Sequence, residues 1–536
     1  MRTWGTSLVL ICATCAIGQS FQRIYGNGQI WSPTAFAASS DAYYLLHNSS
    51  TDGSGAEIVK LDHEGDTIWA LDLPYQGMRV AFGEGAVYTT LMSSGPDFPD
   101  NFLLKLDTAG NVVWANRTSY HPEDYLFNYN SRIHVLPDGV LAVGQMDMGG
   151  DYGSNYGITL SRYDANGELL WGKSYGSPYY SLNALASVLA PNGDVVVAGT
   201  RLTSLSPEFS TALMLARFTA QGDPVWMRAF ADTVDLPGIC NPLDLVTTND
   251  GEYALLAERA ARSVLVKFDD AGEMTWGQQL YTADPFWLRP RSLIQDSEDR
   301  FVIAGGGASF PSPDYVFLAR LGSDGTVIDA LRIADQGYAY APLYTTTAFG
   351  QELVEQSSGQ GYVISHAYSP YQETSWHALS TVDGNGMPGC PELGLPLDLL
   401  TQPYSWSDEP WLALPDTVMT MSGTLVAIDV TPMDENITDM CSLVTGAAGP
   451  TRAGTDLRIW PTPATDALTC EWTQQAAGVT RLELIDALGR AIQRTTLHCA
   501  VGPQRLTLPV ADHARGIYLL RMIMGGSTTG RRVILE

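Results

Sequence analysis

The sequence predicts an all-β protein, and three observations support that fold class. A short hairpin motif recurs along the chain: an alternating strand, a Gly-containing turn and a second strand that opens on Trp, as in Lys60–Trp69. The flanking residues alternate between apolar and polar, as β-strands do. Charged residues make up only 16% of the chain, whereas Gly, Tyr and Thr are plentiful. A repeat of about fifty residues with this pattern is typical of one blade of a β-propeller.

Seven repeats of four strands each are predicted between residues 19 and 390, with six or eight blades as the alternatives. The repeats end near Trp69, Trp114, Trp171, Trp226, Trp276, Asp329 and Cys390. In the fourth repeat the strands are expected at Leu185–Leu189, Asp194–Ala198, Leu213–Phe218 and Pro224–Phe230. We expect the tryptophans to pack between neighbouring blades. The Lys or Arg before each hairpin turn is expected to form a solvated ion pair with the turn Asp.

The two ends of the repeat region are complementary. The seventh repeat has Cys390 in place of the tryptophan, so its outer strand is missing or altered. Phe21–Gly26 matches the outer strand Trp171–Gly176 but has no inner strands before it. We therefore expect Phe21–Gly26 to complete the last blade beside Trp376–Asp383, which would close the ring and remove an open sheet edge.

The N-terminus indicates export. A positive Arg2, an apolar run Leu8–Ile17 and the small residues Ala16 and Gly18 form a signal-peptide pattern over residues 1–18. The apolar run is too short to cross the roughly 30 Å of bilayer hydrocarbon. No later stretch is apolar enough to do so, and we therefore expect an exported, soluble mature chain without a transmembrane segment.

Export permits disulfides, and residues 19–536 keep five cysteines. Cys390 and Cys441 bracket a Pro-rich segment, and a disulfide closing that segment is predicted. Cys470 and Cys499 could form a second bridge, which would leave Cys240 as the odd thiol. Residues 391–454 are interpreted as a strand-bearing strap at the edge of the ring, followed by a flexible linker.

The formal net charge of −28 argues against nucleic acid as a partner, because phosphates require a basic surface. The charge is unevenly distributed. From Arg452 to the end the chain has ten Arg, no Lys and seven acidic residues, which gives this part a net charge of +3.

Long loops are expected on one face of the ring, formed by the connections between second and third strands and by the crossovers between blades. They are rich in Tyr, Asp and Ser, which suits glycan or protein contacts. The candidate binding residues are Tyr125, Tyr129, Tyr152, Tyr179, Tyr180, Trp287, Tyr338, Tyr340 and Tyr371. The alternative is that these loops only cover blade edges.

No catalytic residues are predicted. The sequence contains no His-Glu-x-x-His pair, no Gly-x-Ser-x-Gly nucleophile elbow and no Gly-rich phosphate loop. Asp147 and Asp151 could hold a calcium ion, but we expect a ligand-free acidic loop and no cofactor. A non-enzymatic binding module is the first hypothesis. The alternative is a secreted polysaccharide-active hydrolase or lyase, since carboxylates and Tyr could converge from different blades on the long-loop face.

The hairpin partly resembles the repeat of quinoprotein dehydrogenases, which also place Gly four residues before Trp, as Gly65 and Trp69 are here. Those repeats carry a Thr before the Gly, and those enzymes use adjacent cysteines that this chain lacks. A quinone cofactor is therefore not expected. The hairpin is more similar to the propeller-repeat proteins exported by Gram-negative bacteria.

Residues 455–536 differ from the repeats, and their alternation predicts a small Ig-like β-sandwich. Their motif residues are Trp460, Pro461, Pro463, Asp486, Gly489, Arg490, Gly516 and Tyr518. This order resembles the type A C-terminal sorting domain of the type IX secretion system, with Thr462 where that family usually has Asn. The resemblance implies passage through the periplasm and across the outer membrane, recognition by the translocon, and cleavage by a sortase as the cargo is released or attached to surface lipopolysaccharide. A generic Ig-like adhesive module is the alternative.

Overall fold

The computed structural model describes most of the chain as β-strands and turns. The described residues are 22–30, 32–48, 55–93, 100–119, 128–147, 156–176, 180–203, 210–232, 240–259, 262–282, 287–308, 315–334, 352–356, 361–371, 374–384, 388, 394–409, 421–433, 437–439, 458–460, 464–474, 478–485, 491–511, 513–524 and 527–535. They contain no helix, which confirms the all-β prediction. The chain divides into two compact units, Met1–Ile437 and Thr438–Glu536.

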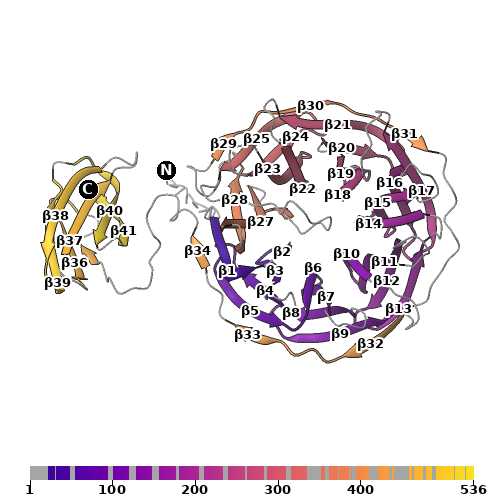
Figure 1. Ribbon diagram of the computed structural model, residues 1–536, viewed down its shortest axis with the longest axis horizontal. Coiled ribbons are helices and arrows are strands. Elements are labelled where there is room, and N and C mark those ends of the chain that lie inside the picture. The colour runs from indigo at the N-terminus through magenta and orange to yellow at the C-terminus, as the bar shows by residue number, and fades with distance from the viewer. Residues whose placement is uncertain are drawn as a thin grey trace, which may run out of the picture. The chain divides into compact units, whose positions relative to one another are not determined.

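The described residues of the first unit form seven antiparallel sheets, called blades 1 to 7 here in chain order (Figure 1). Their strands are β2 (Ser32–Ala38), β3 (Tyr43–Asn48), β4 (Ala56–Leu61) and β5 (Thr67–Leu73) in blade 1; β6 (Gln76–Gly83), β7 (Ala86–Met92), β8 (Asn101–Asp107) and β9 (Val112–Ser119) in blade 2; β10 (Asn128–Leu136), β11 (Gly139–Asp147), β12 (Tyr156–Asp164) and β13 (Leu169–Tyr175) in blade 3; β14 (Tyr180–Leu189), β15 (Val195–Thr203), β16 (Ser210–Phe218) and β17 (Pro224–Asp232) in blade 4; β18 (Cys240–Thr247), β19 (Tyr253–Arg259), β20 (Arg262–Phe268) and β21 (Met274–Thr282) in blade 5; β22 (Trp287–Gln295), β23 (Phe301–Ala308), β24 (Tyr315–Leu321) and β25 (Val327–Ala334) in blade 6; and β26 (Glu352–Glu355), β27 (Gly361–Tyr371) and β28 (Thr374–Asp383) in blade 7.

The blades stand side by side around a ring, each with its first strand nearest the centre (Figure 1). The hydrophobic cores lie between neighbouring blades rather than within one sheet. Tyr44 and Leu46 of blade 1, for example, pack in one cluster with Val87 and Leu104 of blade 2. Each sheet therefore buries its apolar face against the next blade, as expected for a propeller.

The first described strand closes the ring, as predicted. Strand β1 (Gln22–Ile30) pairs antiparallel with β28 of blade 7, with Arg23 opposite Leu379 and Tyr25 opposite His377. Tyr25 is fully buried and packs in the cluster between blades 7 and 1. The last blade is thus completed by residues from the other end of the chain, which leaves no unpaired edge at the join.

The strap runs around the outside of the ring and passes the blades in reverse order, from blade 6 back to blade 1 (Figure 1, orange strands). Strands β29 (Gly394–Pro396), β30 (Leu399–Pro403) and β31 (Trp406–Glu409) pair with the outer strands of blades 6, 5 and 4. Strands β32 (Ser422–Val426) and β33 (Thr431–Met433) then pair with the outer strands of blades 2 and 1. The last strand, β34 (Ile437–Asp439), lies beside β1.

The strap adds apolar surface as well as hydrogen bonds. Trp406 is only 7% exposed and packs against Phe230 of blade 4 and Phe268 of blade 5. Leu397 and Leu399 enter the next core in the same way, between blades 5 and 6. The segment therefore covers sheet edges, which are otherwise prone to pair with other chains, and also seals the seams between blades.

The repeated Gly and Trp of the hairpin contact each other across the seams. A Cβ added to Gly167 of blade 3 would lie 2.5 Å from the Trp114 ring of blade 2, and one added to Gly222 would lie 2.7 Å from Trp171. The turn glycines also have positive φ, +85° at Gly167. The glycine is therefore required both by the turn and by the tryptophan of the preceding blade. This confirms that the tryptophans pack between blades.

The repeated Lys or Arg was predicted to be solvated, and this was wrong. Arg217 is 6% exposed and Lys60 7%. Arg217 binds Asp194 of its own blade at 2.9 Å and the carbonyl of Asp270 of the next blade at 3.1 Å. Lys60 likewise donates to the carbonyl of Thr108, 3.0 Å away in blade 2. The Lys or Arg side chain is buried because it donates a hydrogen bond to a turn carbonyl that lies between the two blades.

The second unit consists of two sheets. Its strands are β35 (Arg458–Trp460), β36 (Ala467–Gln474) and β39 (Gly502–Pro509) in a three-stranded sheet, and β38 (Ala491–Cys499), β37 (Gly478–Ile485), β40 (Gly516–Met524) and β41 (Ser527–Leu535) in a four-stranded sheet, each set in spatial order. Leu468, Trp472, Leu482 and Leu520 pack in the core between them. Nothing among the described residues of either unit forms a helix of the length and apolar character that a membrane crossing requires.

The suggested bridge between Cys470 and Cys499 is not present. Both thiols are free and buried, and their strands, β36 and β38, belong to different sheets. Burial raises the pKa of Cys470 to about 12. The suggestion failed because the sequence indicates which residues are strands but not which sheet each strand joins.

Candidate functional site

Five predicted binding residues of the long-loop face lie outside the described residues, namely Tyr125, Tyr152, Tyr179, Tyr338 and Tyr340. Asp151 of the suggested calcium loop also lies outside them. The backbones of Tyr129, Tyr180 and Trp287 are placed at the start of the innermost strands β10, β14 and β22. The backbone of Tyr371 ends β27, opposite Thr374. Three of the candidates thus lie at or next to the first residue of an innermost strand, in blades 3, 4 and 6.

The innermost strands share a feature that the sequence did not reveal. In each of blades 1 to 6 the pairing of the first with the second strand shifts by one residue, which is the mark of a β-bulge. A bulge bends the strand and re-aims the side chain next to it. In blades 2, 3, 5 and 6 the residue directly after the shift is polar: Arg79, Arg132, Asp244 and Ser292. The last three belong to one group of polar contacts.

These three side chains join blades that are not all neighbours in the ring. An ion pair links the Arg132 guanidinium of blade 3 to Asp244 Oδ1 of blade 5. The equivalent residue of blade 4 between them is Ala186, whose side chain is too small to stand in the way. Asp244 Oδ2 accepts a hydrogen bond from the backbone N–H of Leu293 at 2.8 Å, and Ser292 Oγ lies 3.4 Å away. Asp244 is 6% exposed, so this junction is a structural element inside the ring.

His134 lies two residues beyond Arg132 on β10 and contacts the next blade. Its Nε2 lies 2.9 Å from Ser187 Oγ on β14. Burial, reinforced by the Arg132 guanidinium, lowers the pKa of His134 to about 3. The imidazole is therefore neutral at physiological pH and serves as a hydrogen-bonding partner between blades.

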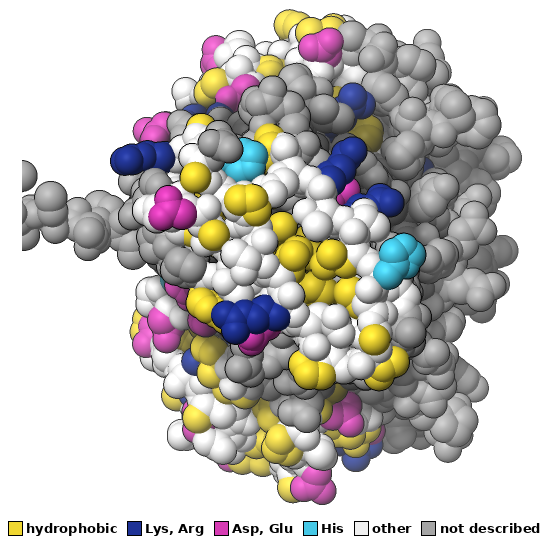
Figure 2. All heavy atoms as spheres, turned by 90° about the vertical axis from the view of Figure 1, so that its left-hand side faces the viewer, with side chains coloured by type: hydrophobic (Ala, Val, Ile, Leu, Met, Phe, Trp, Pro, Cys, Tyr) yellow, Lys and Arg dark blue, Asp and Glu magenta, His cyan; other side chains and the backbone are white. Residues whose placement is uncertain are grey.

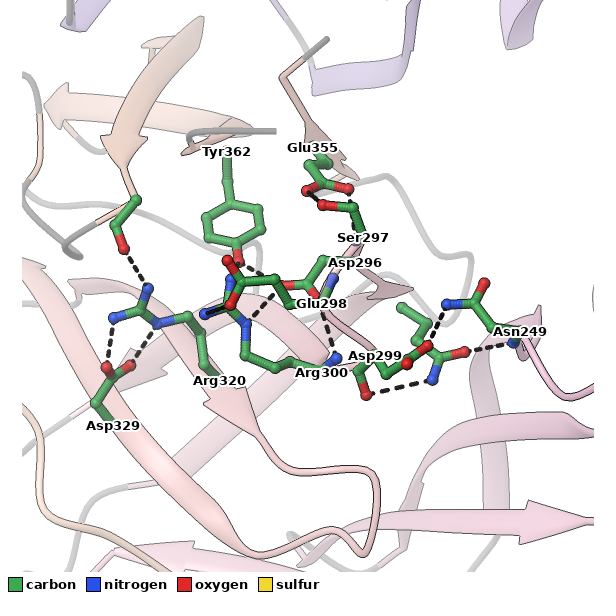
Figure 3. A network of polar contacts seen from close by, with 12 residues as sticks. Asn249, Asp296, Ser297, Glu298, Asp299, Arg300, Arg320, Asp329, Glu355 and Tyr362 are labelled. Atoms are coloured by element: carbon green, nitrogen blue, oxygen red, sulfur yellow. Dashed lines mark hydrogen bonds and ion pairs between the residues drawn. The ribbon is translucent and has the colours of Figure 1, made fainter. Parts of the chain in front are cut away.

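A larger polar network joins blades 5, 6 and 7 near the short turns (Figure 3). Asp296 accepts hydrogen bonds from the Tyr362 hydroxyl at 2.6 Å and from Arg300 Nε at 2.8 Å. Burial would raise the pKa of Asp296, but the hydrogen bonds from Tyr362 and Arg300 hold it below its usual value. Burial and the Asp296 carboxylate raise the pKa of Tyr362. Ser297 and Glu355 extend the network to blade 7, with Oγ 2.7 Å from Oε1.

The view in Figure 3 also contains Asp329, which stands in the sixth repeat where most other repeats have tryptophan. Arg320 of blade 6 donates from Nε and Nη2 to the two carboxylate oxygens of Asp329, the residue in the tryptophan's place. Arg320 also donates to the carbonyl of Gly384 in blade 7 at 2.7 Å (Figure 3). Asp329 therefore orients Arg320, which contacts the next blade. A carboxylate suits this role better than an indole because it accepts hydrogen bonds from the guanidinium.

These carboxylates are not arranged for acid–base chemistry. Asp296 is 1% exposed and accepts from four donors, two of them the backbone N–H groups of Glu298 and Arg300. Asp244 is likewise bound to an arginine and a backbone amide. A general acid or base needs a face open to substrate. Within the described part of the chain, no three His, Cys, Asp or Glu side chains come together as a metal site.

Three residues of the predicted sorting motif are described. Trp460 is 37% exposed, and the Arg505 guanidinium lies over its ring at 5.5 Å. Tyr518 is 8% exposed and donates its hydroxyl hydrogen to the Ala514 carbonyl at 2.6 Å. Gly516, two residues before Tyr518, has a φ of +157°. Pro461, Pro463, Asp486, Gly489 and Arg490 lie outside the described residues, as do Cys390 and Cys441.

Comparison with known proteins identifies the second unit. Residues 458–536 match the family model described as the secretion system C-terminal sorting domain. This range contains every described strand of the two-sheet unit. The chain therefore ends in a sorting domain of the type IX secretion system, and this domain implies export from the cell and contact with the type IX machinery.

The solved structures that match the chain are distant. BamB from Moraxella catarrhalis is 12% identical, with a TM-score of 0.35 over 65% of this chain and 85% of that chain. The extracellular domains 1–2 of Drosophila Semaphorin 1b are 10% identical, with a TM-score of 0.37 over 68% and 87%. An exo-beta-1,3-galactanase from Phanerochaete chrysosporium is 11% identical, with a TM-score of 0.32 over 83% and 98%. No curated protein matches the sequence.

Proposed function

We propose that the protein is a non-enzymatic binding module that the type IX secretion system delivers to the cell surface or the medium. The match of residues 458–536 to the sorting domain supports delivery. A ring of rigid sheets supports the binding role, because such a scaffold presents the loops at its face in fixed positions. The ligand class is a glycan or a protein, bound on the long-loop face.

The proposal includes the fate of the tail. The translocon recognises the sorting domain, and a sortase cleaves it as the cargo is released or attached to surface lipopolysaccharide. The signal peptide at residues 1–18 first carries the chain to the periplasm. The predicted linker Thr445–Gly454 lies between the last strap strand and β35, where cleavage would leave the ring and its strap intact.

Deletion of residues 455–536 tests delivery. Expressed in a bacterium with a working type IX system, the truncated protein should accumulate in the periplasm, whereas the full chain should reach the surface or the medium. Immunoblots of periplasm, outer membrane and medium separate these outcomes. Normal secretion of the truncated protein would refute the role of the tail.

A glycan and polysaccharide array probed with residues 19–536 tests the binding role, scored for both binding and product release. We expect binding without turnover. A variant with Tyr129→Ala, Tyr180→Ala and Trp287→Ala should lose the signal, while Val225→Ala at the exposed outer rim should keep it. Product release would instead establish the hydrolase or lyase, and retained binding by the triple variant would place the site elsewhere.

A further inference from the structure

The sorting domain has a long sheet edge that no described strand covers. In the first unit, by contrast, the strap covers the outer edges of most blades. In the first unit, strap strands pair with the outer strands of blades 1, 2, 4, 5 and 6. In the second unit four strands end the two sheets: β35 has only three residues, β39 contains two prolines, and β41 is bridged by Ala464 at Leu535. The fourth, β38, has no described strand or bridge on its outer side. This edge is nine residues long, and its strand contains no Pro or Lys, two residues that often protect an edge. An edge of this kind is ready to accept an added strand.

The outward face beside that edge is basic. Glu483 on β37 is 3% exposed because Arg494 of β38 and Arg521 of β40 cover it on both sides. The Arg494 side chain nevertheless remains 67% exposed. Arg481, two residues before Glu483 on the same face of β37, is exposed as well.

The composition of this face indicates the kind of partner. Along β38 the outward residues are Ile492, Arg494, Thr496 and His498, all exposed. Figure 2 shows hydrophobic, basic and acidic side chains together on one side of the molecule. Ile492 is the only large apolar side chain of the described outward face of β38, which is too little for insertion into a bilayer. Arginine can bind a carboxylate through two parallel hydrogen bonds. Within this sheet, Arg521 already donates from Nε and Nη2 to the Oε2 atom of Glu483.

We propose that β38 is the docking edge of the sorting domain, and that it receives an extended, acidic segment of a protein of the export machinery as an added strand. The segment pairs with the β38 backbone, and its carboxylates contact Arg494 and Arg481. This inference rests on the proposed delivery by the type IX system and names the surface that this system reads. The rest of the chain is strongly negative, so the basic face distinguishes the sorting domain electrostatically from the cargo to which it is joined.

Charge reversal tests the docking edge in the full chain. The variant R481E/R494E should fall at least about tenfold in secreted fraction and accumulate in the periplasm. Glu483 keeps Arg521 in this variant, so the fold should persist, and an unchanged melting temperature of the purified variant checks this. T507E is the control, because it adds a negative charge at Thr507, which is exposed on β39 of the other sheet. We expect normal secretion of T507E.

A photo-crosslinking amino acid at Thr496 or Thr507 adds a readout that does not depend on secretion rate. Thr496 lies on β38 and Thr507 on the opposite sheet, and both are exposed. In living cells, position 496 should form an adduct with an outer-membrane protein that R481E/R494E abolishes, and position 507 should form none.

The outcomes separate this proposal from the one on which it rests. Normal secretion of R481E/R494E, no adduct at position 496, or an equal defect in T507E would overturn the docking edge even if deletion of 455–536 still traps the protein. Secretion of the deletion variant would instead refute delivery itself. Binding of the wild-type chain, but not of R481E/R494E, to vesicles of 30% phosphatidylglycerol in phosphatidylcholine would show a membrane partner and overturn the acidic strand.

Discussion

The Tyr25 hydroxyl donates a hydrogen bond to the carbonyl of Gly65 at 2.9 Å, across the join between the last and first blades. The same contact occurs inside the ring, where the Tyr175 hydroxyl donates to the carbonyl of Gly222 at 2.5 Å. Two residues earlier, Arg23 pairs with Asp66 as Lys173 pairs with Asp223. The N-terminal strand therefore makes the contacts of an ordinary outer strand, and the join has the chemistry of any other seam.

This equivalence predicts equal effects at the two seams. Tyr25→Phe and Tyr175→Phe should each reduce the free energy of unfolding by about 1 kcal/mol, since each removes one buried hydrogen bond and leaves a carbonyl unpaired. Urea unfolding followed by tryptophan fluorescence measures both. A neutral Tyr25→Phe beside a destabilising Tyr175→Phe would show that the join is weaker than the other seams.

Because some turn glycines contact a tryptophan and others do not, replacing them with alanine should lower the free energy of unfolding by different amounts. Gly85 has a φ of +67° with nothing within 4 Å of an added Cβ, so Gly85→Ala measures the backbone strain alone, about 1 kcal/mol. Gly167 has a φ of +85° and a Cβ there would overlap Trp114, so Gly167→Ala should cost about 3 kcal/mol. Thermal unfolding compares them, and equal costs would contradict the packing role of the tryptophan.

The depressed pKa of His134 predicts a loss of stability in acid. The unfolded chain binds a proton at this position near pH 6.5, whereas the folded protein binds it only near pH 3. The stability that this group contributes is therefore complete above pH 6.5 and is lost as the pH falls toward 3. Between pH 7 and pH 5, wild-type protein should lose about 2 kcal/mol more than His134→Gln. Exposed His498→Gln is the control and should behave as the wild type does; a His134→Gln profile identical to wild type would contradict the buried, neutral imidazole.

The cysteines predict a specific covalent pattern. The strap leaves blade 6 at β29 and reaches β1 of blade 7 at β34, so its two ends return to neighbouring blades. We therefore expect a bridge between Cys390 and Cys441, worth about 4 kcal/mol for a loop of this length. Cys470 and Cys499 should remain free and should react with iodoacetamide only in denaturant. Peptide mapping without reduction checks both statements, and a peptide joining Cys470 to Cys499 would contradict the structure.

The parts of the fold that repeat could be predicted from the sequence. The hairpin turns, the tryptophans and the closing strand all follow a local pattern that recurs, so Phe21–Gly26 could be matched to Trp171–Gly176 without a structure. The course of the strap could not be predicted. Its strands are three to five residues long and contain several prolines, and what fixes their partners is pairing with distant strands.

The polar groups were harder to predict than the apolar ones. Lys60 and Arg217 look solvated in a strand pattern, and only the neighbouring blade shows which carbonyl each one satisfies. The bulges that bring Arg132 to Asp244 leave no mark on the hydrophobic alternation. Tyr129, Tyr180 and Trp287 were expected in long loops, and their backbones lie at the starts of innermost strands; whether they bind a ligand stays a prediction.

Hydrogen exchange tests the central claim most directly, namely that the ring is closed by its first strand and enclosed by the strap. Backbone amides in Arg23–Tyr25, Leu399–Thr401 and Ser422–Val426 should exchange far more slowly than those of an unfolded chain, at rates close to those of β28, β21 and β9, with which these segments pair. The claim would be contradicted if the amides of Arg23–Tyr25 or of the two strap segments exchanged within seconds while those of the blade strands stayed protected.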